Sequence, residues 1–207
     1  MAKASDFSLL LFRSAPTAWD LAGRLSGASD HPISPEGRTR LDEAIDRLGD
    51  LKLDLILSSG DESSLETAEL LAAASGAKVR KCRGLEEVAL GLWEGLRHED
   101  VAERYPSAYK QWISNPSSVR IPGGESLPEA ERRILEALAH GLDRVKAGHE
   151  RVGIVVRPMA WGLLRCWLSA TPIDRLWDTL KDAPLFGWYE VERERLDSVH
   201  SIVGAQP

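Results

Sequence analysis

Short apolar runs alternate with longer amphipathic segments along the 207 residues of this chain. The short runs predict strands at residues 8–12, 53–57, 78–82, 152–156, 184–191 and 198–203. Apolar residues at helical spacing between these runs predict helices over residues 34–48, 61–76, 126–145 and 159–168. Strands that alternate with helices need crossover connections, which favour parallel pairing with helices on both faces. The sequence therefore predicts an α/β fold of three layers, α/β/α, with a mainly parallel central sheet.

The chain is expected to form one domain over residues 1–207, because it contains no repeat, linker or low-complexity tract. Its hydrophobic fraction of 43% is sufficient for a single large core. Residues 96–115 are polar and aromatic with weak helical signals, so a partly helical insertion is expected around 96–125.

Composition argues against several kinds of partner. The net charge of −6 comes without any cluster of lysine and arginine, which argues against nucleic-acid binding. The apolar run at residues 9–12 is far too short to cross a membrane, so no membrane association is expected. Cys82 and Cys166 stand far apart, which indicates a reduced, cytoplasmic protein.

The histidines and cysteines show no spacing typical of a metal site, so neither a metal nor a cofactor is predicted. His98 follows a Trp-Glu-Gly segment, where it could reach the mouth of a pocket, but a surface histidine without a role is the favoured prediction.

Two arginines directly follow predicted buried strands. Arg13 comes after the run at 9–12, and Arg157 comes after the run at 152–156. In open α/β sheets, ligands bind in the crevice at the carboxyl ends of the parallel strands. Both side chains are therefore expected to point into one crevice.

Residues 13–20 read Arg-Ser-Ala-Pro-Thr-Ala-Trp-Asp. This segment resembles Arg-His-Gly-Glu-Thr-x-Trp-Asn, the opening motif of the histidine phosphatase superfamily, the phosphoglycerate mutase-like proteins. Segments 57–68, 87–95, 105–106 and 122–126 are similar to later landmarks of that family and follow in the same order. The resemblance covers nearly the whole chain and implies the phosphoglycerate mutase-like version of the predicted fold.

The resemblance also implies a pocket with defined chemical roles. In the family, one histidine attacks phosphorus, a second histidine and two arginines stabilise the transferring oxygens, and a carboxylic acid donates a proton. Arg13 matches the first arginine, a bidentate phosphate ligand, with a structural ion pair as the alternative. Glu87 matches the acid, with an ion pair to a neighbouring arginine as the alternative.

The other positions of that pocket are changed. Ser14 stands in place of the nucleophilic histidine, and Ser63 stands in place of the second arginine. The second histidine falls at Arg157 or Pro158, so both family histidines are missing. Asp20 stands where the family has asparagine and adds negative charge near the expected phosphate site.

Each changed position has a structural interpretation beside the functional one. Ser14 has no adjacent base and is predicted to be a small polar residue bonded to nearby backbone. Ser63 is predicted to belong to a capped helix start. Arg157 either restores the positive charge lost at Ser63 or forms an ion pair. The partners for such an ion pair are Glu87, Asp61 and Glu62.

Two sets of site residues follow from the resemblance. The catalytic candidates are Glu87, Ser14 and Arg157. The anion-binding candidates are Arg13, Arg157, Ser14 and Ser63.

Three hypotheses of function remain open at this point. The first is a catalytically inactive member of the family, a pseudophosphatase, that binds a phosphorylated or other anionic ligand or a protein partner. The second is a phosphohydrolase or phosphomutase-like enzyme with an altered mechanism that uses Arg13, Arg157 and Glu87. The third is a scaffold, such as a homodimer, for which the seven tryptophans could supply an interface.

Overall fold

The computed structural model describes residues 6–146, 148, 150–181 and 183–203, and it contains a five-stranded sheet of order β3-β2-β4-β1-β5. The strands are β1 (Phe7–Arg13), β2 (Leu55–Ser58), β3 (Lys78–Lys81), β4 (Arg151–Val156) and β5 (Phe186–Val191). Neighbouring strands pair in parallel, except that β5 runs antiparallel to β1. The prediction of a mainly parallel sheet is confirmed.

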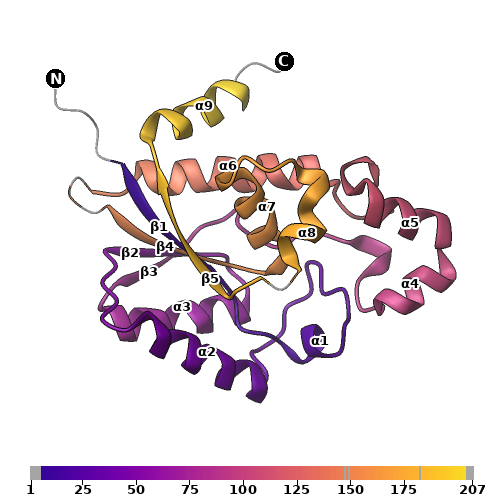
Figure 1. Cartoon of the computed structure of the whole chain (residues 1–207), viewed down its shortest axis with the longest axis horizontal. Helices are drawn as coiled ribbons and strands as arrows, with labels where there is room; N and C mark the ends of the chain where they lie inside the picture. Colours follow the sequence, from indigo (N-terminus) through magenta and orange to yellow (C-terminus); the bar gives the residue numbers. More distant parts are fainter. Residues whose placement is uncertain (1–5, 147, 149, 182, 204–207) are drawn as a thin grey trace.

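Helices cover both faces of this sheet, as Figure 1 shows. One layer holds α2 (Pro35–Leu48) and α3 (Glu62–Ser75), and the opposite layer holds α6 (Leu127–Asp143) and α7 (Pro158–Leu168). The predicted three-layer α/β/α architecture is therefore confirmed.

The central strand β1 supplies side chains to both cores because successive residues of a strand point to opposite faces. Leu9 and Leu11 pack in the core that contains residues of α6 and α7. Leu10 and Phe12 pack in the core that contains residues of α2 and α3. All four side chains are at most 1% exposed, so the end of β1 is held rigidly from both sides.

The predicted helix starts are confirmed by their caps. The hydroxyl of Ser34 accepts a hydrogen bond from Gly37 N at 2.9 Å, and the carboxylate of Asp61 accepts one from Ser64 N at 3.0 Å. Ser126 and Glu129 form a capping box at the start of α6.

The predicted strand at 198–203 is wrong, because these residues belong to the helix α9 (Arg193–Val203). Leu196 and Val199 are buried and stand three residues apart, which is helical spacing. Taken apart from Leu196, the apolar residues within 198–203 resemble a short strand.

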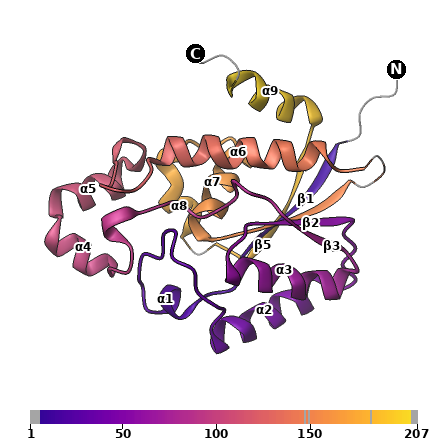
Figure 2. The same cartoon turned by 180° about the vertical axis from the view of Figure 1, so that it is seen from behind.

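The segment around 96–125 contains α4 (His98–Arg104), α5 (Pro106–Ser114) and the 3-10 helix η2 (Pro116–Ser118). Trp112 of α5 is 1% exposed, and its ring contacts the rings of Trp93 and Trp177. These contacts fix the segment to the 3-10 helix η1 (Gly91–Trp93) and to α8 (Leu176–Leu180). Figure 2 shows α4 and α5 at one end of the molecule, beyond α8 and the short helix α1 (Ala18–Leu21).

A further 3-10 helix, η3 (Ile173–Arg175), leads directly into α8. Within the described ranges, every helix is too short or too polar to cross a bilayer.

Candidate functional site

A cavity of about 300 Å³ lies where β1 ends and α7 begins. Its walls come from the end of β1, the α1 segment, α2, the loop before η1, the start of α4, the start of α7, and α8. The charged and polar lining residues include Arg13, Ser14, Asp20, Arg40, Glu87 and His98, and Met159 lies beside them. The volume is at the lower end of the range for small-molecule sites.

Arg13 is the last residue of β1, and its side chain lines the cavity. Burial lowers the pKa of the Arg13 guanidinium, while the nearby charge of Asp20 opposes this shift. Arginine stays protonated despite such a shift, so Arg13 presents a positive charge to the cavity. The predicted position of this residue in a crevice is what the structure shows.

Ser14 also lines the cavity, although it is only 2% exposed. Its backbone N donates to the carbonyl of Val156 at 2.8 Å, which continues the pairing of β1 with β4. Among the described residues, no histidine or carboxylate is hydrogen-bonded to Ser14 Oγ. A serine hydroxyl without such a base is a weak nucleophile.

Glu87 lines the cavity and, at the same time, caps α7. Its Oε2 accepts a hydrogen bond from Met159 N, and its Oε1 accepts one from Ala160 N, both at 2.8 Å. Oε1 also accepts one from Val88 N at 2.8 Å. The first N–H groups of a helix have no partner within the helix, and a carboxylate there also interacts favourably with the helix dipole. The Glu87 carboxylate therefore caps the N-terminus of α7.

Burial raises the pKa of the Glu87 carboxyl. The charge of Arg157 and the three backbone N–H groups oppose that rise. Pro158 fits this arrangement, because proline at the first position of a helix lacks an N–H that would otherwise need a partner.

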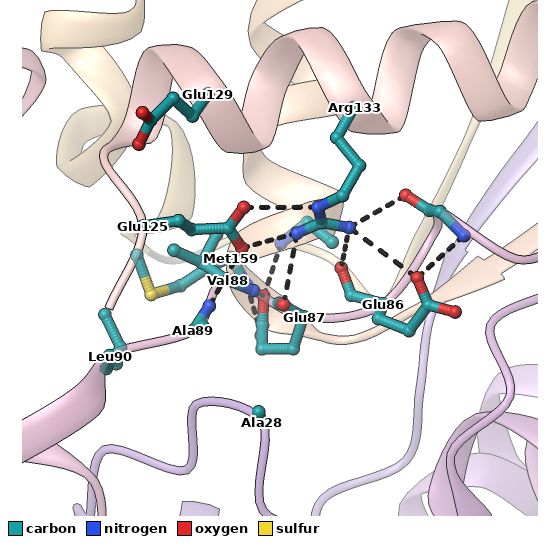
Figure 3. Close-up of polar contacts among 12 residues, drawn as sticks. Ala28, Glu86, Glu87, Val88, Ala89, Leu90, Glu125, Glu129, Arg133 and Met159 are labelled. Carbon is teal, nitrogen blue, oxygen red and sulfur yellow. Dashed lines mark hydrogen bonds and ion pairs between the residues drawn. The ribbon is translucent and has the colours of Figure 1, made fainter. Parts of the chain in front are cut away.

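The loop that carries Glu87 is held by an arginine that sequence reasoning missed. Figure 3 shows Arg133 of α6 between this loop and Glu125. Its guanidinium donates to the carbonyl oxygens of Gly84 at 2.8 Å and Glu86 at 3.1 Å. It also donates to the carbonyl of Glu87 at 3.3 Å, and its Nη2 lies 2.5 Å from Glu125 Oε1. Arg133 therefore fixes the backbone from which the Glu87 side chain reaches α7.

The same loop passes very close to Gly124. A Cβ atom at residue 124 would lie 2.5 Å from the carbonyl oxygen of Ala89 and 3.1 Å from the carbonyl carbon of Leu90. Both contacts are with backbone, which cannot rotate away as a side chain can.

Gly124→Ala is expected to lower the free energy of unfolding by about 2 kcal/mol, as overpacking of a well-filled region does. Chemical denaturation followed by tryptophan fluorescence would measure the change. Gly49→Ala is not a suitable control because Gly49 has a positive φ of 61°. Gly60→Ala is suitable, since no atom lies within 4 Å of the added Cβ. Equal stability of the two variants would contradict the predicted clash.

Arg157 is buried beside the cavity without lining it, so the prediction that its side chain points into the same crevice as that of Arg13 is wrong. It is 1% exposed, and its Nη1 donates to the carbonyl of Ser29 at 2.8 Å. Its Nη2 lies 3.9 Å from Asp20 Oδ1, and within the described ranges Nε and Nη2 have no hydrogen-bond partner. The ion-pair partner is therefore Asp20, and the predicted partners Asp61 and Glu62 are not used; Glu87 is affected only through the field of Arg157.

Asp20, which the sequence placed near the expected phosphate site, is fixed there by contacts that the sequence did not predict. Its Oδ2 accepts hydrogen bonds from Thr17 N at 2.8 Å and from Thr17 Oγ1 at 2.7 Å. Its Oδ1 accepts one from Ser26 Oγ at 3.3 Å. These three bonds hold the carboxylate in place between Arg13, whose pKa it affects, and Arg157.

Ser63 is fully buried and does not line the cavity. Its hydroxyl donates to Asp61 Oδ1 at 3.0 Å, and its carbonyl accepts from Thr67 Oγ1 at 2.7 Å. Thr67 Oγ1 in turn accepts from Ala15 N at 2.9 Å. Ser63 thus belongs to a helix start that is tied to the loop after β1. This agrees with the prediction that Ser63 belongs to a capped helix start.

His98 lies at the cavity, the alternative that the sequence left open, and is not the surface histidine that was favoured. It begins α4, is half-buried, and lines the cavity. Its Nδ1 lies 3.4 Å from the Tyr109 hydroxyl, and burial lowers its pKa, which favours the neutral ring. Contacts of Arg97 with Arg24 and of His98 N with the carbonyl of Gly23 bring His98 to the cavity.

Within the part of the chain that the structure describes, no three histidine, cysteine, aspartate or glutamate side chains are grouped so that they could hold a metal ion. The candidate site consists of Arg13, Ser14, Asp20 and Glu87 on the cavity wall and of Arg157 behind it.

Comparison with known proteins identifies the family of this chain. Residues 9–198 match the model of the histidine phosphatase superfamily (branch 1). Phosphoserine phosphatase 1 of Hydrogenobacter thermophilus is 28% identical over 90% of this chain and 88% of its own length. The protein named probable phosphoglycerate mutase GpmB of Salmonella choleraesuis is 30% identical over 64% of this chain and 62% of its own length.

Two solved structures are similar across most of the chain. The mycobacterial glucosyl-3-phosphoglycerate phosphatase has a TM-score of 0.71 and 25% identity, over 83% of this chain and 84% of that one. The structure named Bacillus stearothermophilus YhfR has a TM-score of 0.73 and 27% identity, over the same shares. On the match of the family model over residues 9–198, this chain belongs to the histidine phosphatase superfamily.

Proposed function

We propose that this protein binds an anionic ligand in the cavity beside Arg13 and does not catalyse the phosphoryl transfer of its superfamily. The observation that carries the proposal is the position of Ser14 on the cavity wall, where no histidine or carboxylate among the described residues is hydrogen-bonded to its hydroxyl. Loss of a covalent nucleophile can reduce an enzymatic rate by about a million-fold, and loss of its helpers then adds little.

The state of Glu87 supports the absence of transfer. A general acid must be able to deliver its proton to a substrate oxygen. Both carboxylate oxygens of Glu87 already accept hydrogen bonds from backbone N–H groups, two of which belong to α7. The Glu87 carboxylate, to which the resemblance assigns proton donation, is therefore already hydrogen-bonded as the cap of α7.

The charge of Arg13 supports binding. Its side chain lines the cavity, and a guanidinium can bind a carboxylate or a phosphate through two parallel hydrogen bonds. The mycobacterial glucosyl-3-phosphoglycerate phosphatase, which is 26% identical with a TM-score of 0.68, has been solved in complex with inorganic phosphate. Binding of an anion by this chain, beside Arg13, is part of the proposal.

Titration with inorganic phosphate, phosphoesters and carboxylates, followed by melting temperature, tests the proposal. A ligand at about 100 times its Kd adds about 2.7 kcal/mol of stability, which raises the melting temperature by several degrees. We expect this rise with at least one class of anion, and we expect Arg13→Ala to abolish it.

Arg38→Ala is the matched control for that titration. Arg38 lies on the exposed face of α2, where it pairs with Asp42 and does not line the cavity. An exposed pair of this kind contributes little to stability. If no anion raises the melting temperature, or if Arg13→Ala leaves the rise intact, the proposed binding site is wrong.

The second candidate is an enzyme with an altered mechanism that uses Arg13, Arg157 and Glu87. One observation favours it: burial raises the pKa of Glu87, a cavity-lining carboxyl, and a raised pKa is typical of a general acid. In such an enzyme, Arg13 would bind the anion and Glu87 would move a proton to or from water. Phosphate release that disappears in Glu87→Gln would support this enzyme. The control is Glu103→Ala, an exposed position of α4, which should keep the release.

Two further predictions, on the cellular compartment and on the partner of the protein, belong to the same proposal. We propose a reduced, cytoplasmic location, which the two free thiols of Cys82 and Cys166 support. A homodimer is the partner that the tryptophan content suggests, and native mass spectrometry would distinguish it from a monomer.

A further inference from the structure

We propose that the ligand of the cavity is an amphipathic monoanion: a single negatively charged group, of the carboxylate type, joined to an apolar body. The inference rests on the proposed function and specifies the class of ligand that the cavity binds. It follows from three features of the wall: one uncommitted cation, fixed carboxylates beside it, and an apolar remainder.

Three arginines line the cavity, and two of them already have partners. Arg24 Nη1 donates to the carbonyl of Gly95 at 2.5 Å. Arg40 forms an ion pair with Glu36 on the same helix. For Arg13, by contrast, no side-chain hydrogen bond or ion pair is formed with any residue that the structure describes. One free guanidinium can bind one carboxylate-like group in a bidentate manner.

Two carboxylates on the same wall oppose a second negative charge. Asp20 is held by Thr17 and Ser26 and so cannot swing away when a ligand enters. Glu87 is held by three backbone N–H groups. The other cations near them already have partners: Arg157 is buried and contacts Ser29 and Asp20, Arg24 binds the carbonyl of Gly95, and Arg40 pairs with Glu36. The local charge therefore favours a monoanion over a doubly charged phosphate.

The remainder of the wall is mainly apolar. Its apolar side chains are Leu21, Leu25, Leu90, Met159, Trp177 and Leu180. The indole Nε1 of Trp177 donates to the carbonyl of Trp112, so this N–H is not available to a ligand. A sugar hydroxyl placed against such a wall would lose its hydrogen bonds to water, whereas an apolar body would gain from burial. The wall thus fits an aromatic or aliphatic body better than a polyol.

Calorimetric titration with four probes tests this inference. The probes are 3-phenylpropionate, its neutral amide, phenylphosphonate at a pH where it carries two charges, and inorganic phosphate. We expect 3-phenylpropionate to bind about tenfold more tightly than each of the others, which corresponds to one charge-assisted hydrogen-bond pair. Arg13→Gln should remove this preference over the amide, and Arg38→Ala should preserve it.

Asp20→Asn provides the second arm of the experiment. An asparagine oxygen can still accept the hydrogen bond of Thr17 N, while the negative charge is removed. We expect the affinity for phenylphosphonate to rise by about tenfold and to rise more than that for 3-phenylpropionate. Should this variant not fold, Leu180→Gln addresses the apolar wall, and it should weaken 3-phenylpropionate without affecting inorganic phosphate.

The outcomes separate the two proposals. If phenylphosphonate or phosphate binds as tightly as 3-phenylpropionate to the wild-type protein in an Arg13-dependent way, the amphipathic monoanion is wrong and anion binding stands. If the amide binds as tightly as the carboxylate, the proposal that the cavity recognises a negatively charged group is wrong. If none of the anions binds, the proposed function fails together with this inference.

Discussion

Glu87→Ala is expected to lower the free energy of unfolding by about 3 kcal/mol, because buried N–H groups lose their acceptor. Three backbone groups depend on this carboxylate, and two of them lie in the first turn of α7. Arg157 at the N-cap position offers no side-chain hydrogen bond that could replace it. The loss exceeds that of an ordinary exposed cap, which is about 1 kcal/mol. Urea unfolding of both proteins at neutral pH would measure the difference.

Glu103→Ala is the matched control for this measurement. Glu103 is an exposed glutamate of α4, so its removal should change stability by less than about 0.5 kcal/mol. A Glu87→Ala protein as stable as the control would mean that the carboxylate does not serve as the cap of α7. The argument that Glu87 is occupied in a structural role would then fail.

Arg157→Met is expected to lower the free energy of unfolding by about 3 kcal/mol at pH 8, and by much less near pH 5. Methionine fills a similar volume but leaves the buried carboxyl of Glu87 without the charge that now opposes its pKa rise. The pKa of Glu87 therefore rises further in the variant. A carboxyl with a raised folded-state pKa stabilises the fold below its unfolded pKa, and this contribution is lost as pH rises through the folded pKa. The deficit of the variant must then grow from acidic to alkaline pH.

Urea unfolding of wild type and Arg157→Met across this pH range provides the test. The double variant Arg157→Met, Glu87→Gln is the control, because it has no carboxyl at residue 87 to titrate. Its deficit should not vary with pH in the same way. A deficit of Arg157→Met that is equal at both ends of the range would contradict the electrostatic coupling of the two residues.

Much of the fold could be predicted because its signals are local. The central strands β1 and β4 are short apolar runs, and the helix starts at Ser34, Asp61 and Ser126 carry capping residues. The strand predicted at 198–203 failed where the apolar signal was ambiguous, since short apolar segments fit both a strand and one face of a helix.

The candidate site could be predicted only in part. Arg13 and Ser14 lie at the end of a central strand, so topology alone brings them to the crevice. The structural role of Glu87, the burial of Arg157 and the bridge made by Arg133 depend on contacts between segments far apart in the chain. Such contacts leave no periodicity or spacing in the sequence.

The most direct test of the account is phosphate release from a broad panel of phosphoesters at high protein concentration, with Arg13→Ala and Glu87→Ala proteins measured beside the wild type. Both variants should first be shown to be folded under the assay conditions, since Glu87→Ala is expected to be less stable. The account predicts that the wild type releases no more phosphate than either variant, because Ser14 is not an activated nucleophile. Release by the wild type that is lost in both variants would contradict it and would show that this cavity retains catalysis.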